Sequence, residues 1–245
     1  MTTARPDWWN DAFRSAYLEV YHHRDDAQAV AEVAGLLPRL RQLPGPVIDA
    51  GCGAARHLQA LRAVGILAFG CELSSDLLAV AQQRTACRGN LVRADLRAPP
   101  FVGDCGAVLC LFTVFGYFDD AGNQACLAAL GRMLAAQGRL VLDLPDPLAT
   151  RRDLRPSSKR TTPHGWLVEE TRRLVGQRVE KTVVATPPTG PPSTWHECVR
   201  LYDAEELAEM AALAGLRIDT IWSGLRGPQS PEGRLVAWLA LIAGQ

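Results

Sequence analysis

The 245-residue chain carries 26 Lys and Arg residues against 26 Asp and Glu residues, and its pI is about 6.9. This balance lacks the basic footprint of nucleic-acid-binding proteins, so we expect no nucleic-acid partner. Hydrophobic residues make up 48% of the chain, which is enough for one substantial core. We therefore expect a single domain over residues 1–245.

The seven cysteines are scattered, and none of them forms a C-x-x-C pair. An odd count of this kind indicates free thiols in a reducing cytoplasm. The five histidines do not cluster with the cysteines at ligand spacing, so we expect no metal site. The first residues lack the pattern of a signal peptide, and no apolar run reaches the roughly 18 residues of a membrane span. We therefore expect a cytoplasmic protein without membrane contact.

The first 150 residues read as a helical segment followed by alternating strands and helices. Residues 1–45 are expected to form a helical lid. Strand-like runs then follow at 46–51, 66–73, 90–95, 106–112 and 138–145. Amphipathic stretches separate them, one capped by Ser74 or Ser75 and one spanning 123–138. This alternation predicts right-handed crossovers and a parallel sheet, with residues 46–150 as a cofactor-binding core.

The last third changes character. Residues 151–203 are expected to form an antiparallel insertion that roofs a substrate site, with strands from 165 onward and the basic run 151–160 as a solvated loop. Residues 204–245 then supply a helix, which begins at the capping-box pair Asp203 and Glu206, and two closing strands. The predicted fold class is α/β: a Rossmann-like, seven-stranded, mostly parallel sheet with helices on both faces, plus an antiparallel β insertion before the last two strands.

The first strand runs into a glycine-rich turn. It ends in Asp49-Ala50-Gly51-Cys52-Gly53, and the N–H groups of the helix that follows favour a polar or anionic group. Ligands of open parallel sheets bind at such carboxyl ends. Arg56 occupies the place of the third glycine in a dinucleotide fingerprint, and no Lys-Ser or Lys-Thr pair follows. The turn therefore argues against both a dinucleotide site and a phosphate loop.

The next two strands each end in an acid. Glu72 can accept hydrogen bonds from both hydroxyls of a ribose. Asp95 can accept one from an adenine amino group while Leu96 gives apolar contact. Either acid alone could be a surface or capping residue. Together with the turn at 49–53 they predict a nucleoside site.

These segments resemble the class I S-adenosylmethionine-dependent methyltransferases. "VIDAGCGAARH", "GCELS" and "VRADL" look like the first three motifs of that family, and "AVLCLFTVFGYF" and "GRLVLDLP" look like its fourth and fifth strand regions. A narrower similarity, through Tyr17, Tyr21 and the "GYF" after the fourth strand, is to bacterial small-molecule enzymes, including sugar N-methyltransferases. The resemblance implies S-adenosyl-L-methionine as cofactor, S-adenosyl-L-homocysteine as product, and methyl transfer to an N or O atom of a small molecule by in-line displacement.

The resemblance also implies roles for individual residues. The methionyl part would face the loop at 50–53, with Tyr17, Tyr21 and Arg24 closing over the cofactor, although the tyrosines could equally be ordinary helix packing. Candidate bases are Tyr117, His164 and His196, and the histidines could equally be surface residues. The expected cofactor-binding residues are Asp49, Ala50, Gly51, Cys52, Gly53, Glu72, Leu73, Asp95, Leu96, Leu111, Tyr17, Tyr21 and Arg24.

Several alternatives stay open. The chain could methylate a protein or RNA, could be a nicotinamide-dependent oxidoreductase, or could bind the cofactor without catalysis. Residues 111–117 lack the Asn- or Asp-Pro-Pro-aromatic motif of nucleobase amino-methyltransferases, which disfavours a nucleobase acceptor. A homodimer is also left open.

Overall fold

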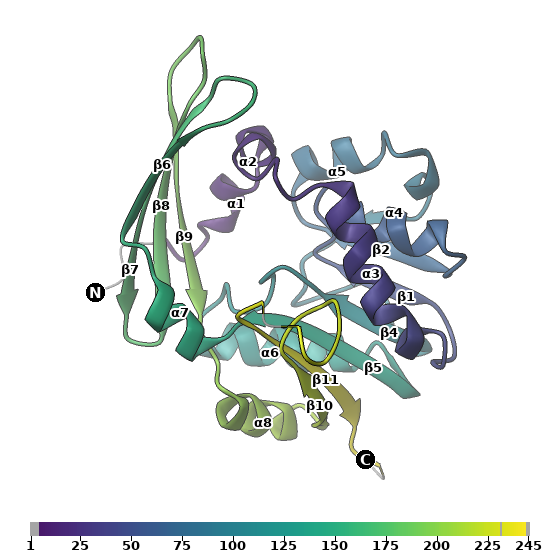
Figure 1. Cartoon of the computed structure of the whole chain (residues 1–245). Coiled ribbons are helices and arrows are strands. Elements are labelled where there is room, and N and C mark those ends of the chain that lie inside the picture. The colour runs from purple at the N-terminus through teal and green to yellow at the C-terminus, as the bar shows by residue number, and fades with distance from the viewer. Residues whose placement is uncertain (1–4, 231, 244–245) are drawn as a thin grey trace.

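The computed structural model describes residues 5–230 and 232–243, which form two separate sheets (Figure 1). The larger sheet has seven strands in the order β10-β11-β5-β4-β1-β2-β3, and β11 runs antiparallel to both of its neighbours. Its strands are β1 (Val47–Ala50), β2 (Ala68–Glu72), β3 (Leu91–Arg93), β4 (Cys105–Cys110), β5 (Leu134–Pro145), β10 (Leu216–Trp222) and β11 (Arg234–Leu241). This sheet and the antiparallel insertion confirm the predicted fold class.

Helices cover both faces of the larger sheet because its strands are apolar on both sides. Along β5, Leu140 and Leu142 join one buried cluster, whereas Val141 joins the other. The helices α3 and α4 pack on the face of Val141, and α6 and α8 pack on the opposite face (Figure 1). The helices of the core are α3 (Asp26–Leu40), α4 (Arg56–Ala63), α5 (Ser75–Ala81), α6 (Asp120–Gly131) and α8 (Ala204–Leu213), with a 3₁₀ turn at Thr85–Cys87.

The smaller sheet is antiparallel and stands beside the core, with two short N-terminal helices against it (Figure 1). Trp8 and Val20 pack with Val168, Val183 and Trp195 in a third buried cluster. The N-terminal helices thus bridge the two sheets. The elements of this region are α1 (Trp9–Ala12), α2 (Ser15–Val20), α7 (Pro147–Asp153), β6 (Ser157–Thr161), β7 (Leu167–Val175), β8 (Arg178–Thr186) and β9 (Ser193–Arg200).

Two sequence predictions are wrong in detail. Residues 151–160 are not a loop, because Asp146 caps α7 and the following residues pair with β7 as the edge strand β6. The helix predicted over 123–138 ends at Gly131, and Leu134 belongs to β5. Leu134 fits the spacing of a helix as well as that of a strand, because a short apolar run is compatible with the periods of both. The predicted capping box of α8, the Ser74 cap of α5 and the free state of all seven cysteines are confirmed.

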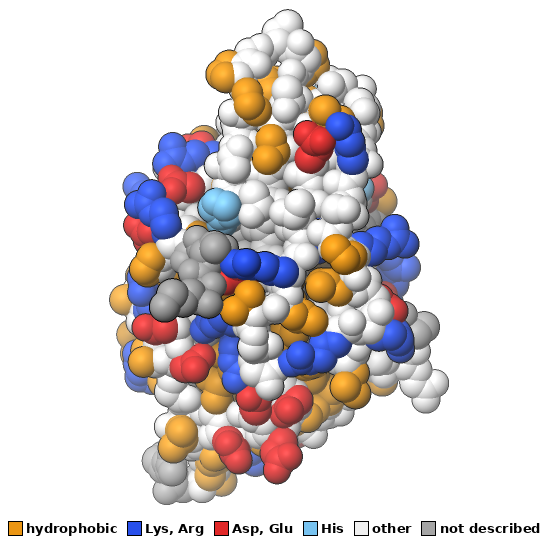
Figure 2. Space-filling view, turned by 90° about the vertical axis from the view of Figure 1, so that its left-hand side faces the viewer, with side chains coloured by type: hydrophobic (Ala, Val, Ile, Leu, Met, Phe, Trp, Pro, Cys, Tyr) orange, Lys and Arg blue, Asp and Glu red, His pale blue; other side chains and the backbone are white. Residues whose placement is uncertain are grey.

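The outer face of the smaller sheet is polar. Figure 2 shows acidic and basic side chains interspersed over this side of the molecule. Among the residues that the structure describes, no helix is long and apolar enough to cross a membrane. In the same residues, no three His, Cys, Asp or Glu side chains gather in a way that could hold a metal ion.

Candidate active site

A cavity of about 990 Å³ opens where the order of the parallel strands reverses, between β1 and β4. Ligands of open α/β sheets bind at such a reversal. Tyr17, Tyr21, Arg24, Asp49, Gly51, Cys52, Gly53, Glu72, Leu73, Asp95, Leu96, Leu111 and Tyr117 line the cavity. Of the predicted site residues, Ala50, His164 and His196 are not part of its lining.

The turn after β1 depends on glycine at position 51. Gly51 has a φ of +75°, and a β-carbon there would come within 2.4 Å of Val114 Cγ1. Any other residue would therefore be strained and would collide with the loop that follows β4. Beyond the turn, Ala55 also has a left-handed backbone, with φ +62°, and α4 begins at Arg56. The turn leaves backbone atoms exposed on the cavity wall.

The carboxylate of Glu72 is held by backbone N–H groups. Its Oε1 accepts hydrogen bonds from the N–H groups of Leu73 and Ser74 at 2.8 Å each, and Oε2 accepts one from Gly53 at 2.9 Å. Burial raises the pKa of Glu72, and these three N–H groups oppose that shift. A carboxylate has about four acceptor sites, so roughly one remains for a ligand. If Glu72 pairs with both hydroxyls of a ribose, as predicted, both hydroxyls must donate to this one remaining acceptor site.

Asp49 presents a buried oxygen without a partner. Its side chain is 2% exposed, and Oδ2 makes no hydrogen bond to any residue that the structure describes. Burial raises the pKa of Asp49 to about 6. Asp49 lines the cavity, and buried polar atoms are rarely left unpaired, so this oxygen can accept a hydrogen bond from a group that enters there.

Asp95, two residues after the end of β3, is paired with a neighbour that sequence reasoning missed. Arg97 binds both of its carboxylate oxygens, with Nη2 to Oδ2 at 2.7 Å. These hydrogen bonds from Arg97 lower the pKa of Asp95. The same guanidinium lies 4.4 Å from the ring centre of Phe118 and 5.6 Å from that of Trp9. Asp95 therefore holds Arg97 against Phe118 and Trp9, whose rings line the cavity in the region predicted to take adenine.

Two arginines lie close to the ring of Phe112 at the cavity wall. The guanidinium carbons of Arg24 and Arg56 are 5.1 and 5.2 Å from the centre of its ring. Arg24 donates to the hydroxyl of Tyr17 at 3.3 Å, and Arg56 donates to the carbonyl of Asp25 at 2.7 Å. Neither arginine forms an ion pair with a described residue. Arg56, which in the sequence only excluded a dinucleotide, thus supplies a second positive charge to the cavity.

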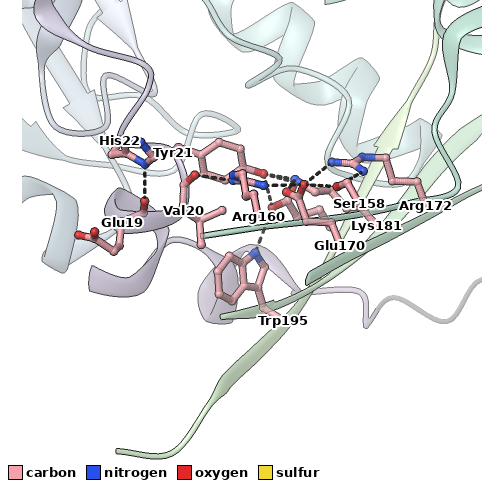
Figure 3. A network of polar contacts seen from close by, with 11 residues as sticks. Glu19, Val20, Tyr21, His22, Ser158, Arg160, Glu170, Arg172, Lys181 and Trp195 are labelled. Carbon is pink, nitrogen blue, oxygen red and sulfur yellow. Dashed lines mark hydrogen bonds and ion pairs between the residues drawn. The ribbon is translucent and has the colours of Figure 1, made fainter. Parts of the chain in front are cut away.

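Tyr21 connects the helix α2 to the smaller sheet (Figure 3). Its hydroxyl donates to Glu197 Oε1 at 2.9 Å and accepts from Lys181, whose ammonium also lies 2.8 Å from Glu170. Arg160 donates to the carbonyl of Val20 at 2.6 Å. Sequence reasoning missed all three acids and bases of this contact: Lys181 and Glu197 meet Tyr21 across 160 and 176 positions. Glu170 meets its partners on β6 and β8 only through the pairing of β6, β7 and β8, whose register the sequence does not show.

Glu170 is the centre of this charged cluster. Its side chain is 4% exposed and accepts from Ser158, Arg160 and Arg172 as well as from Lys181 (Figure 3). Burial opposes its ionisation, but the neighbouring cations, with Lys181 foremost, override burial and lower its pKa to about 2. The cluster therefore keeps its charges and fixes α2 over the cavity.

Of the three predicted bases, only Tyr117 faces the cavity. Its ring packs against Trp8 at 4.8 Å and Phe13 at 5.6 Å, and its hydroxyl has no hydrogen-bond partner among the described residues. Burial raises the pKa of Tyr117 well above its usual value. Its hydroxyl is thus free to bind a ligand but is poorly suited to ionise.

The two histidines point elsewhere. The ring of His164 is exposed, with Nδ1 2.6 Å from Glu19 Oε1. His196 lies between Trp195 and Glu197 in β9, and its Nδ1 is 2.9 Å from Thr182 Oγ1. Side chains alternate along a strand, and Trp195 and Glu197 face the N-terminal helices, so His196 faces away from them.

Comparison with known proteins agrees with this geometry. Residues 47–138 match the family model described as a methyltransferase domain. The chain is 31% identical over 112 residues to dTDP-3-amino-3,6-dideoxy-alpha-D-glucopyranose N,N-dimethyltransferase of Streptomyces fradiae, over 46% of this chain and 43% of that protein. The chain matches about half of the length of its curated relatives.

Solved structures share the fold over nearly the whole chain. An S-adenosylmethionine-dependent methyltransferase from Clostridium acetobutylicum has a TM-score of 0.77 at 12% identity, over 92% of this chain and 96% of that one. CalS10, an amino pentose methyltransferase from Micromonospora echinaspora, has a TM-score of 0.69 at 23% identity, over 93% and 97%. Residues 47–138 therefore match a methyltransferase domain, within a chain that has the fold of the S-adenosylmethionine-dependent methyltransferases.

Proposed function

We propose that this chain is an S-adenosylmethionine-dependent methyltransferase that acts on an amine of a small molecule, with amino sugars as the favoured class. The observation that carries the proposal is the unpaired, buried Oδ2 of Asp49 beside the glycine turn. Glu72 has one acceptor site left, and Asp49 Oδ2 lacks a hydrogen-bond donor. A ligand with both a nucleoside and an amino-acid ammonium group would supply donors to both acids.

The residues present fit this cofactor. Glu72 would hold the ribose, Asp49 the amino group, Arg24 the carboxylate, and the wall near Asp95 and Leu96 the adenine. Bound there, S-adenosylmethionine supplies a methyl group that is already activated by its sulfonium. The chain's own task is to bind and orient the acceptor and to exclude water.

Nitrogen is favoured over oxygen as the attacking atom because the cavity offers none of the predicted bases in a usable form. A hydroxyl acceptor needs a base within hydrogen-bond reach, whereas a neutral amine does not. His164 and His196 lie off the cavity, and burial raises the pKa of Tyr117. The names of two relatives, a dTDP-amino-sugar dimethyltransferase and an amino pentose methyltransferase, support an amino sugar as the acceptor.

The segments around the cavity divide into a lid, a roof and a body. We infer that residues 5–24 act as the lid and that the insertion 151–203 roofs the acceptor. Because the helix α3 packs on the larger sheet, it is not part of the lid. The proposed lid is therefore residues 5–24 and not the whole of 1–45. Residues 25–150, which include α3, and residues 204–243 then form the body of a single domain.

Calorimetric titration tests the cofactor. We expect S-adenosylhomocysteine to bind, NAD not to bind, and Glu72→Ala to bind S-adenosylhomocysteine much more weakly than the unaltered protein does. Binding of NAD alone, or of neither compound, would contradict the proposal. The acceptor is then tested with nucleotide-linked amino sugars and with the same sugars carrying a hydroxyl in place of the amine. Methylation of only the hydroxyl compounds, detected by mass spectrometry, would overturn the choice of nitrogen.

A further inference from the structure

The loop after β4 has a strained backbone next to the cavity. Phe112 and Thr113 have φ values of +56° and +63°, in the left-handed region that disfavours residues with a β-carbon. Thr113 is β-branched, which makes this conformation rarer still. Such strain persists where surrounding contacts enforce it, and it concentrates at binding and catalytic sites.

One buried ion pair enforces this conformation. Asp143, in β5, is 1% exposed, and its Oδ2 accepts the N–H of Phe112 at 2.7 Å while its backbone carbonyl accepts the N–H of Thr113 at 3.1 Å. Arg234, in β11, donates from Nε to Asp143 Oδ1 at 2.7 Å and from Nη2 to Thr113 Oγ1 at 3.1 Å. The Asp143–Arg234 pair therefore holds both strained residues through their N–H groups and one side chain.

The strained conformation places the ring of Phe112 beside two cations. The guanidinium carbons of Arg24 and Arg56 lie 5.1 and 5.2 Å from its centre, and the ring of His57 lies 5.3 Å away. The aromatic face attracts both guanidinium groups, and for Arg24 it acts together with the ring of Tyr21, whose centre lies 4.3 Å from the guanidinium carbon. Neither arginine has an acidic partner among the described residues, so both retain N–H groups for an anion. Arginine presents these donors as a planar fork that suits a carboxylate.

We propose that Asp143 and Arg234 are positioning residues, which fix Phe112 as a shared platform for Arg24 and Arg56, and that the two guanidinium groups together bind the carboxylate of the cofactor's amino-acid part. This inference rests on the proposed function and adds to it the second arginine and the distant pair that orients both. Asp143 and Arg234 touch no ligand; they act only through the loop.

The test compares two ligands that share an adenosine and differ in the amino-acid part. S-adenosylhomocysteine carries the carboxylate, and 5′-methylthioadenosine lacks it. For Asp143→Asn we expect the affinity for S-adenosylhomocysteine to fall tenfold or more by calorimetry, while the affinity for 5′-methylthioadenosine stays within about twofold. Asp219→Asn is the matched control, since Asp219 is also a strand aspartate paired with an arginine, Arg39, but lies outside the cavity lining.

A second variant covers the case in which Asp143→Asn does not fold. Phe112→Leu keeps the ion pair and removes only the platform, and the same selective loss is expected. Equal weakening of both ligands, or no change for either, would overturn the inference while leaving the proposed function intact. If the unaltered protein binds neither ligand, the proposed function itself fails, and this inference fails with it.

Discussion

The two walls of the cavity are built by different means. On the strand-end wall, Glu72 is held by three backbone N–H groups, two of which come from the next two residues. On the lid side, Tyr21 is held by Lys181 and Glu197, which lie 160 and 176 positions away. Backbone donors survive most substitutions, whereas a charged cluster depends on each of its side chains. Mutations in the first wall should therefore reduce ligand affinity, and mutations in the second should reduce stability.

The largest effect is expected for Glu72→Ala. The variant loses hydrogen bonds of about 1.5–3 kcal/mol each and leaves buried N–H groups unpaired, so its affinity for S-adenosylhomocysteine should fall by two to three orders of magnitude, roughly. Calorimetry measures the change. Glu169→Ala is the control, because Glu169 is an exposed partner of Lys159. A fall of less than about threefold would mean that the strand-end wall does not hold the ligand.

Glu170→Gln tests the other wall. The substitution leaves Lys181, Arg160 and Arg172 without their shared carboxylate, and we expect the free energy of unfolding to drop by about 3 kcal/mol, measured by urea denaturation. The same figure follows from the lowering of the pKa of Glu170 from 4.5 to about 2. A variant as stable as the original would show that the cluster does not stabilise the lid.

The pH dependence of stability sharpens this test. A carboxyl with a lowered pKa in the folded state stabilises above its unfolded pKa and loses that contribution as the pH falls through the folded pKa. The contribution of Glu170 should therefore be complete above about pH 4.5 and should disappear between there and about pH 2. Unfolding curves of the original protein and of Glu170→Gln should converge over this interval.

The protonation of Asp49 is expected to have a smaller effect on ligand affinity. Burial raises its pKa to about 6, and an ammonium group of the ligand needs the ionised carboxylate. The affinity for S-adenosylhomocysteine should therefore fall about tenfold as the pH drops from 7 to 5. In Asp49→Asn this slope should vanish. An equal slope in both proteins would assign it to another group.

The smallest effects concern the predicted bases. Tyr117→Phe removes a hydroxyl from the lining of the cavity and should lower kcat/KM about fivefold, the value of one neutral hydrogen bond. His196→Ala should leave kcat/KM unchanged within about twofold, because His196 points away from the lid. A large loss in the His196 variant would show that the smaller sheet moves during turnover.

The sequence alone determined the features that depend on local patterns. The glycine turn after β1, the acids that end β2 and β3, and the capping box of α8 are each set by a few adjacent residues. The glycine turn and the two acids lie at one edge of the sheet because β1, β2 and β3 run parallel, so that their carboxyl ends are on the same side. The fold class was predictable for the same reason, because periodicity and turn residues act over short distances.

Only the tertiary structure decided which distant side chains meet. Arg234 reaches Asp143 across 91 positions and thereby fixes Phe112, and Arg160 reaches Val20 across 140. The face of each side chain in the smaller sheet depends on strand register, where a shift of one residue turns every side chain to the opposite face. That register directs Glu197 toward Tyr21 and His196 away from it. No local pattern carries this information, because long-range packing selects the register.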